Sequence, residues 1–136
     1  MTLDAFLHPV ELKQEKEVVI SKRFQDSEGK LVPFKIRTIS QEENEALSKR
    51  SVHIKKIDGR QFEALDDLEY TRRLIVACTV YPDFTNSELC QAYGVMDPLM
   101  VPGKMLISGE YKRLLQEIMK FNGFTSAVDL EEEAKN

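Results

Sequence analysis

The chain has 136 residues, of which 42% are hydrophobic and 31% are charged, and its formal net charge is −4. This size and balance are typical of one globular domain, and they exclude a membrane protein, a collagen-like fibre and a wholly disordered chain. Nineteen basic against twenty-three acidic residues also lack the net positive charge that nucleic-acid-binding domains usually carry. We therefore predict a single domain over residues 1–136, with no nucleic acid and no membrane among its partners.

The N-terminus and the cysteines predict a cytoplasmic protein. The N-terminus has no basic leader, carries Asp4 and reaches Pro9 before the apolar segment of a signal peptide could form. The longest apolar run, Leu74 to Cys78, has five residues, whereas a membrane-spanning helix needs about twenty. Cys78 and Cys90 fit a reducing compartment, because each lies in a predicted helix and neither has the partners of a metal site.

Residues 17–39 predict an antiparallel β-hairpin. Gly29 lies in a polar turn and can supply the positive φ that such turns often need. Pro33 lacks an N–H, which places the second strand at the edge of a sheet or Pro33 on its unpaired side. The apolar residues of the two halves alternate with polar ones and form one face: Val18, Ile20 and Phe24, then Val32, Phe34 and Ile36.

Two helices are predicted in the middle of the chain. The first covers residues 40–51 and begins with a capping box of serine and glutamate. The second covers residues 66–81 and ends there because a residue before proline disfavours helical backbone, and Pro82 follows. Between the two helices, Asp58-Gly59 marks a turn, and the pattern leaves open whether residues 54–64 form a second hairpin.

The rest of the chain predicts further helices. A short helix closes at Gly94, residues 95–104 are expected to form a loop because they hold two prolines and a glycine, and a regular amphipathic helix then runs to Gly123. Residues 125–136 predict a last helix and an acidic tail. Residues 40–124 are thus the helical part, and the fold class is α+β, with an N-terminal antiparallel β-hairpin packed on a small bundle of about four to five α-helices.

No motif for catalysis, for a metal or for a cofactor is present. The sequence has no glycine-rich phosphate loop, no Gly-x-Ser-x-Gly and no His-Glu-x-x-His. Its two histidines, His8 and His53, stand outside any such motif. A basic cluster between Lys49 and Arg60 is flanked by glutamates, which is typical of a solvated face. We predict that the protein is not an enzyme and takes no cofactor and no metal.

Three of the five methionines lie within ten residues, together with large aliphatic side chains. Methionine is flexible and polarisable, so such a cluster can form an adaptable surface for apolar partners. The alternative is that this segment folds back and buries its apolar side chains in the core. The surrounding residues 66–103 hold six acidic and two basic residues, so most of the chain's net charge falls there. The predicted partner-binding residues are Met96, Leu99, Met100, Val101, Met105 and Leu106.

Between Tyr81 and Phe124, short motifs follow one another in a fixed order. They are Tyr81-Pro82-Asp83-Phe84, Leu89-Cys90-Gln91-Ala92-Tyr93-Gly94-Val95, Asp97-Pro98, Val101-Pro102-Gly103-Lys104-Met105-Leu106, Gly109-Glu110-Tyr111 and Asn122-Gly123-Phe124. In this order, and in the hairpin ahead of a capped helix, the chain resembles the tail assembly chaperones of contractile-tailed phages and of defective prophages in Gram-positive bacteria, the XkdN-like family.

The resemblance implies a non-catalytic assembly factor. Members of this family are thought to coat the long tape-measure protein, whose apolar helices otherwise aggregate, and to bring tail-tube subunits to it before they leave the finished tail. The expected partners are therefore the tape-measure protein and the tail-tube protein, in the bacterial host cytoplasm and not in the mature particle. The alternative is a structural component of the virion, such as a tail-tube or baseplate subunit. A nucleic-acid-binding regulator is a third class, which the net charge disfavours.

Many tail chaperones are made in two lengths by a −1 ribosomal frameshift. The residues Ala134-Lys135-Asn136 can be encoded by a slippery A-AAA-AAT/C heptamer. The resemblance therefore also suggests a longer frameshift product of the same gene as a possible partner.

Overall fold

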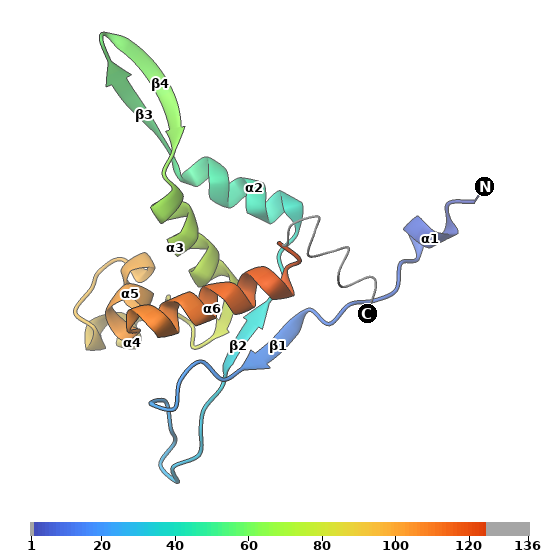
Figure 1. Cartoon of the computed structure of the whole chain (residues 1–136), viewed down its shortest axis with the longest axis vertical. Coiled ribbons are helices and arrows are strands. Elements are labelled where there is room, and N and C mark those ends of the chain that lie inside the picture. The colour runs from blue at the N-terminus through green and yellow to red at the C-terminus, as the bar shows by residue number, and fades with distance from the viewer. Residues whose placement is uncertain (1, 125–136) are drawn as a thin grey trace.

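The structure, a computed structural model, describes residues 2–124 and is drawn in Figure 1. Its elements, in chain order, are α1 (Asp4–Leu7), β1 (Glu15–Val18), β2 (Phe34–Arg37), α2 (Gln41–Arg50), β3 (Val52–Ile57), β4 (Arg60–Leu65), α3 (Asp67–Cys78), β5 (Thr79–Tyr81), α4 (Ser87–Ala92), the 3₁₀-helix η1 (Pro98–Met100), α5 (Val101–Met105) and α6 (Ser108–Phe121). The predicted α+β class, with an N-terminal antiparallel hairpin and several helices, is confirmed.

The N-terminal hairpin is part of a three-stranded antiparallel sheet with the order β1-β2-β5. Val18 of β1 lies opposite Phe34 of β2, and Lys35 lies opposite Tyr81 of β5. The prediction of an edge position for the strand after Pro33 is therefore wrong, because β2 is paired on both sides. Pro33 causes no gap in the ladder, since it lies one residue before β2.

The core lies between this sheet and the helices. α6 packs against β2 and α3, and α3 also contacts α2, η1 and α5. Apolar residues of the sheet alternate inward, while those of α3 and α6 recur at helical spacing, so both sets meet in one interior. The most deeply buried apolar residues are Ile20, Phe34, Ile36, Leu74, Ile75, Cys78, Phe84, Val101, Leu114 and Ile118.

The second long helix ends earlier than predicted, and its last residues form a strand. α3 stops at Cys78, and Thr79–Tyr81 is β5, at the edge of the sheet. Thr79 and Val80 are β-branched, and Tyr81 precedes Pro82, so each of the three residues favours extended backbone. The start of α3 is as predicted, because Asp66 caps the helix: its Oδ1 accepts the Glu69 N–H at 3.0 Å.

Most of the predicted loop at residues 95–104 is helical, because η1 and α5 together cover residues 98–105 and only residues 95–97 are irregular, which corrects that prediction. Asp97 Oδ1 accepts the Leu99 N–H at 3.0 Å, and Pro98 occupies the first position of η1. Proline is well suited to the first turn of a helix, where its missing N–H has no partner to lose. α5 follows immediately and carries Pro102 in its own first turn.

The open question about residues 54–64 is answered, because β3 and β4 form a second antiparallel hairpin. Asp58 and Gly59 form its turn with φ of 51° and 79°, as a tight two-residue hairpin connection requires. Figure 1 shows this hairpin and the N-terminal segment with α1 leaving the body in different directions.

Every helix within residues 2–124 is too short or too polar to cross a bilayer. The predicted C-terminal helix, at residues 125–136, lies outside the described residues.

Candidate protein-binding surface

The six predicted partner-binding residues separate into two groups. Met96 is fully exposed (100%), Met100 is 39% exposed, and Leu99 is half-buried. The other three residues lie in the core: Val101, Met105 and Leu106 are exposed by 0%, 7% and 6%. The burial of Val101, Met105 and Leu106 follows the alternative interpretation, and partner binding by the other three residues stays a prediction. We call Met96, Leu99 and Met100 the methionine surface.

The backbone beneath the methionine surface is held in place from both ends. The Val95 N–H donates to the Cys90 carbonyl at 3.0 Å, and the Met100 N–H donates to the Asp97 carbonyl at 2.9 Å. Val101 and Met105, one turn of α5 apart, fix the segment to the core. The methionine side chains are therefore adaptable while their positions on the fold are fixed.

Two hollows border the methionine surface, and Leu99 lines both. One hollow, of about 290 Å³, is lined by Leu99, Met100 and Tyr111 together with the cations Arg72 and Lys104. The other, of about 480 Å³, holds Arg50 and Arg73 beside Leu99. Burial raises the pKa of Tyr111 above its ordinary value, so this phenol stays neutral at neutral pH.

The charge around the methionine surface differs between the two hollows: Arg72 and Lys104 line the smaller one, whereas Glu69 and Asp97 line the larger one together with its two arginines. Residues 66–103 are acidic in sum, yet both of their basic residues, Arg72 and Arg73, line these hollows. Arg73 Nε is buried and has no hydrogen-bond partner among the described residues. In the larger hollow Arg73 is already paired with Glu69, so the cationic side of the surface is the smaller hollow, which fits a carboxylate beside a bound apolar helix.

A third hollow, which the sequence analysis missed, lies at the end of the sheet. It has a volume of about 320 Å³, and the apolar part of its lining is Phe24, Val32, Pro33, Phe34, Tyr81, Pro82, Leu89, Tyr93 and Met105. These residues come from distant parts of the chain, so no local motif marks them. We call this hollow the sheet-end groove.

An ion pair borders the sheet-end groove. Arg23 donates from Nε to Glu110 Oε2 at 2.9 Å and from Nη2 to Glu110 Oε1 at 2.5 Å. It also lies over the ring of Phe24, with its Cζ 5.0 Å from the ring centre. Glu110 is only 4% exposed, and its hydrogen bonds from Arg23 lower its pKa from 4.5 to about 2. Glu110 is therefore ionised and tied to Arg23 throughout the physiological range.

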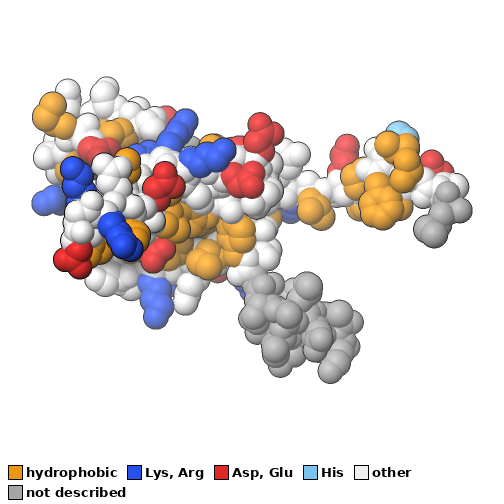
Figure 2. All heavy atoms as spheres, turned by 90° about the horizontal axis from the view of Figure 1, so that it is seen from above, with side chains coloured by type: hydrophobic (Ala, Val, Ile, Leu, Met, Phe, Trp, Pro, Cys, Tyr) orange, Lys and Arg blue, Asp and Glu red, His pale blue; other side chains and the backbone are white. Residues whose placement is uncertain are grey.

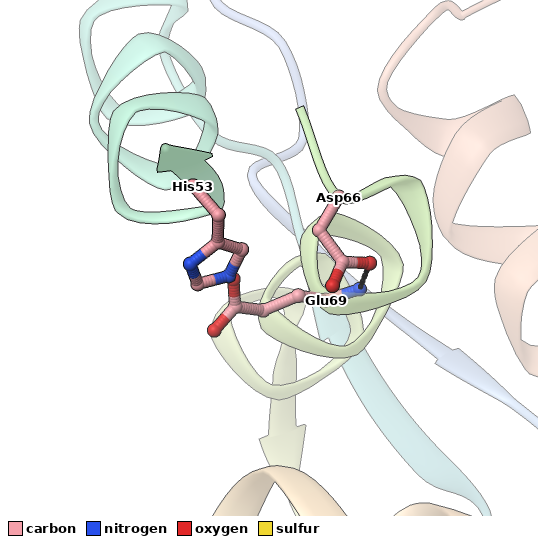
Figure 3. A group of neighbouring side chains, drawn as sticks. All are labelled: His53, Asp66 and Glu69. Carbon is pink, nitrogen blue, oxygen red and sulfur yellow. Dashed lines mark hydrogen bonds and ion pairs between the residues drawn. The ribbon is translucent and has the colours of Figure 1, made fainter. Parts of the chain in front are cut away.

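One group of metal-ligand residue types exists among residues 2–124, at the base of the β3–β4 hairpin (Figure 3). His53 Nε2 lies 2.7 Å from Glu69 Oε2, and Asp66 caps α3 through the Glu69 N–H. Arg73 Nη2 lies 3.3 Å from the other oxygen of Glu69. Because Glu69 already has two partners, and one is a cation, hydrogen bonding explains the cluster: it joins the hairpin to α3.

The comparisons with known proteins identify the family. A family model described as the phage XkdN-like tail assembly chaperone protein matches residues 3–135. The chain belongs to this family. It is 38% identical over 126 residues to the phage-like element PBSX protein XkdN of Bacillus subtilis strain 168, and 41% identical over 126 residues to the protein YqbN of the same strain. Each alignment covers 90% of this chain and 85% of the relative.

A solved structure supports the same assignment to the XkdN-like family. The crystal structure of YqbN superposes with a TM-score of 0.75 at 34% identity, covering 92% of this chain and 98% of the YqbN chain. The resemblance inferred from the motifs between Tyr81 and Phe124 is therefore confirmed, and it extends over nearly the whole chain. The surfaces described above are those of a tail assembly chaperone of this family.

Proposed function

We propose that this chain binds amphipathic helices of a tape-measure protein through the methionine surface, keeps them from aggregating and helps to bring tail-tube subunits to them. The observation that carries the proposal is the full exposure of Met96 near Leu99 and Met100, and these two residues border a hollow that is also lined by Arg72 and Lys104. Membership of the tail assembly chaperone family supports a partner within the tail. The expected site of action is the host cytoplasm.

The form of the surface supports a helix as the bound segment. Apolar residues on one face of a helix recur every three or four positions, and a few flexible thioethers can adapt to many such faces. A long tape-measure helix offers many faces of different sequence, so a binder of low sequence specificity is needed. Arg50, Arg72 and Lys104 would meet acidic residues on either side of the apolar stripe, whereas Arg73 is already paired with Glu69.

The direct test is coexpression with a fragment of the cognate tape-measure protein, measured as the soluble fraction of that fragment. We expect the wild-type chain to keep the fragment soluble and Met96→Asp with Met100→Asp to lose this effect. Met119→Asp is the matched control, because Met119 is 38% exposed on α6, outside the hollows. The free energy of unfolding of both variants should match that of the wild type within about 0.5 kcal/mol. If the surface variant still solubilises the fragment, the proposed site is wrong.

The alternative, a structural tail-tube or baseplate component, has a separate test. A chaperone leaves before the tail is complete, so mass spectrometry of purified particles should find tail-tube protein and no peptide of this chain. Stoichiometric recovery of its peptides from particles would favour the structural role instead.

The possible longer product of the same gene is a further part of the proposal. Residues 134–136 lie outside the described part of the structure, so the reading frame decides the matter. A slippery site requires AAA for Lys135 and an open −1 frame downstream. An AAG codon at Lys135 excludes that site.

A further inference from the structure

The N-terminal segment, residues 2–12, projects from the body and carries large apolar side chains in water (Figure 1). We call it the N-terminal arm. Its exposed fractions are high: Leu3 67%, Phe6 81%, Leu7 64%, Val10 89% and Leu12 80%. Figure 2 shows hydrophobic side chains gathered on a lobe that stands apart from the rest of the molecule. Five such residues in one short segment form an apolar patch of the kind that marks a binding surface.

The arm also has the form of a binding element. Leu3, Phe6 and Leu7 lie three and four residues apart and share one side of α1, whose turn is closed by the Phe6 and Leu7 N–H groups donating to the Leu3 carbonyl at 2.9 Å. This spacing is the one by which helical segments insert anchors into apolar grooves. Asp4 lies in the same turn and gives the element a negative charge.

The sheet-end groove has the complementary properties. Its volume of about 320 Å³ is at the lower end of the range of about 300–1,000 Å³ for pockets that hold ligands. Its aromatic and aliphatic lining suits the side chains of Phe6 and Leu7. Arg23 borders it with a side chain that remains 51% exposed although Glu110 holds one edge of the guanidinium. A carboxylate such as that of Asp4 can therefore meet the outer edge of Arg23.

The direction of the chain decides whose groove the arm can reach. Val18 lies opposite Phe34, a groove residue, whereas Glu15 lies opposite Arg37 at the other end of the sheet. The Gln14 carbonyl continues this ladder by accepting the Thr38 N–H at 2.9 Å. The arm thus leaves the sheet at the end away from the groove of its own chain. To fill that groove, the arm would have to turn back and run the length of β1. The arm of a neighbouring copy can enter the groove without such a turn.

We infer that the sheet-end groove binds the N-terminal arm of a second copy of this chain. Phe6 and Leu7 fill the groove, and Asp4 pairs with Arg23. Because each copy has one arm and one groove, reciprocal exchange gives a closed dimer with two identical contacts. This surface is separate from the methionine surface, so self-association and the proposed binding of tape-measure helices can be tested independently.

The first experiment measures the mass of the full-length chain in solution by light scattering over a wide range of protein concentration. We expect a concentration-dependent dimer for the wild type. Phe6→Asp should raise the dimer dissociation constant at least about thirtyfold, as for a central interface anchor. Tyr81→Asp, at a 58% exposed groove residue, should do the same from the other side. Ile54→Asp is the matched control, because Ile54 is 67% exposed on the β3–β4 hairpin, and it should leave the dimer unchanged.

The second experiment mixes the two variants. Phe6→Asp retains an intact groove and Tyr81→Asp retains an intact arm, so the mixture should form a heterodimer through the one remaining contact although each variant alone is monomeric. This result would also show that both variants are folded. A wild type that is monomeric at every concentration, a dimer that survives Phe6→Asp, or a mixture that stays monomeric would each overturn the inference. A monomer in which Phe6→Asp exposes the groove to an apolar dye would mean that the arm fills the groove of its own chain.

Discussion

The ion pair between Arg23 and Glu110 should make folding stability depend on pH. Glu110 is buried at the start of α6, where its carboxylate accepts two hydrogen bonds from Arg23 and one, at 3.0 Å, from the Ile107 N–H. These bonds, above all those from the Arg23 side chain, lower the pKa of Glu110 from 4.5 to about 2. A group whose pKa is lower in the folded state stabilises the fold above its unfolded pKa and loses that contribution as the pH falls to the folded value.

The size of the effect can be worked out from the shift. At about 1.4 kcal/mol per pKa unit, a fall from 4.5 to about 2 corresponds to about 3 kcal/mol. The side chain of Arg23 is half exposed, so water screens part of this interaction, and we expect about 2 kcal/mol at pH 7. Glu110→Gln should therefore lower the free energy of unfolding by about 2 kcal/mol at pH 7. The difference from wild type should shrink between about pH 5 and pH 2.

Urea unfolding followed by circular dichroism at several pH values measures this directly. Glu117→Gln is the control on the same helix, because Glu117 Oε2 lies 3.8 Å from Lys16 Nζ and both side chains are partly exposed. That pair should contribute less than about 0.5 kcal/mol. The reasoning is refuted if Glu110→Gln costs no more than Glu117→Gln, or if wild type and Glu110→Gln lose the same stability between pH 7 and pH 3.

Three further predictions concern the body of the fold. Asn122→Ala should destabilise the protein by about 2 kcal/mol in thermal or urea unfolding, because Asn122 Oδ1 accepts the Ile39 N–H at 2.8 Å and its loss leaves that N–H without a partner. Burial raises the pKa of Cys78 to about 11, so its thiol should not react with Ellman's reagent at pH 8 until urea unfolds the chain. Asp66→Ala should cost about 1 kcal/mol through loss of the α3 cap on the Glu69 N–H, whereas Asp66→Asn should cost little.

The parts of the fold that the sequence predicted are those with a local cause. The antiparallel pairing of the N-terminal hairpin, the turn at Asp58-Gly59 and the spacing of residues in α6 each involve neighbours along the chain, and the structure shows all three. The strands of that hairpin are shorter than the alternation within residues 17–39 predicts, because β1 ends at Val18 and β2 begins at Phe34. The errors depend on contacts that are distant along the chain. Thr79–Tyr81 favours extended backbone locally, but its pairing as a strand depends on the open edge of β2, which lies about forty residues earlier.

The candidate surfaces were harder to predict for the same reason. Met96 and Met105 are the same residue type nine positions apart, yet one is fully exposed and the other lies in the core, because α5 rotates Met105 inward. Only the Asp97-Pro98 pair, a helix-start signal, could have corrected the predicted loop. The sheet-end groove combines residues from Arg23 to Met105 and has no sequence signature at all.

The place of β5 in the sheet also sets the order in which the chain can fold. β3 and β4 are joined by two residues and can pair as soon as both have been synthesised, whereas the central strand β2 obtains its second neighbour only when Thr79–Tyr81 has emerged. The buried face of β2 then needs α6, which ends at Phe121. During synthesis, the hairpin should therefore form early and alone, and the sheet should become protected from hydrogen exchange in one late step after residue 121 leaves the ribosome.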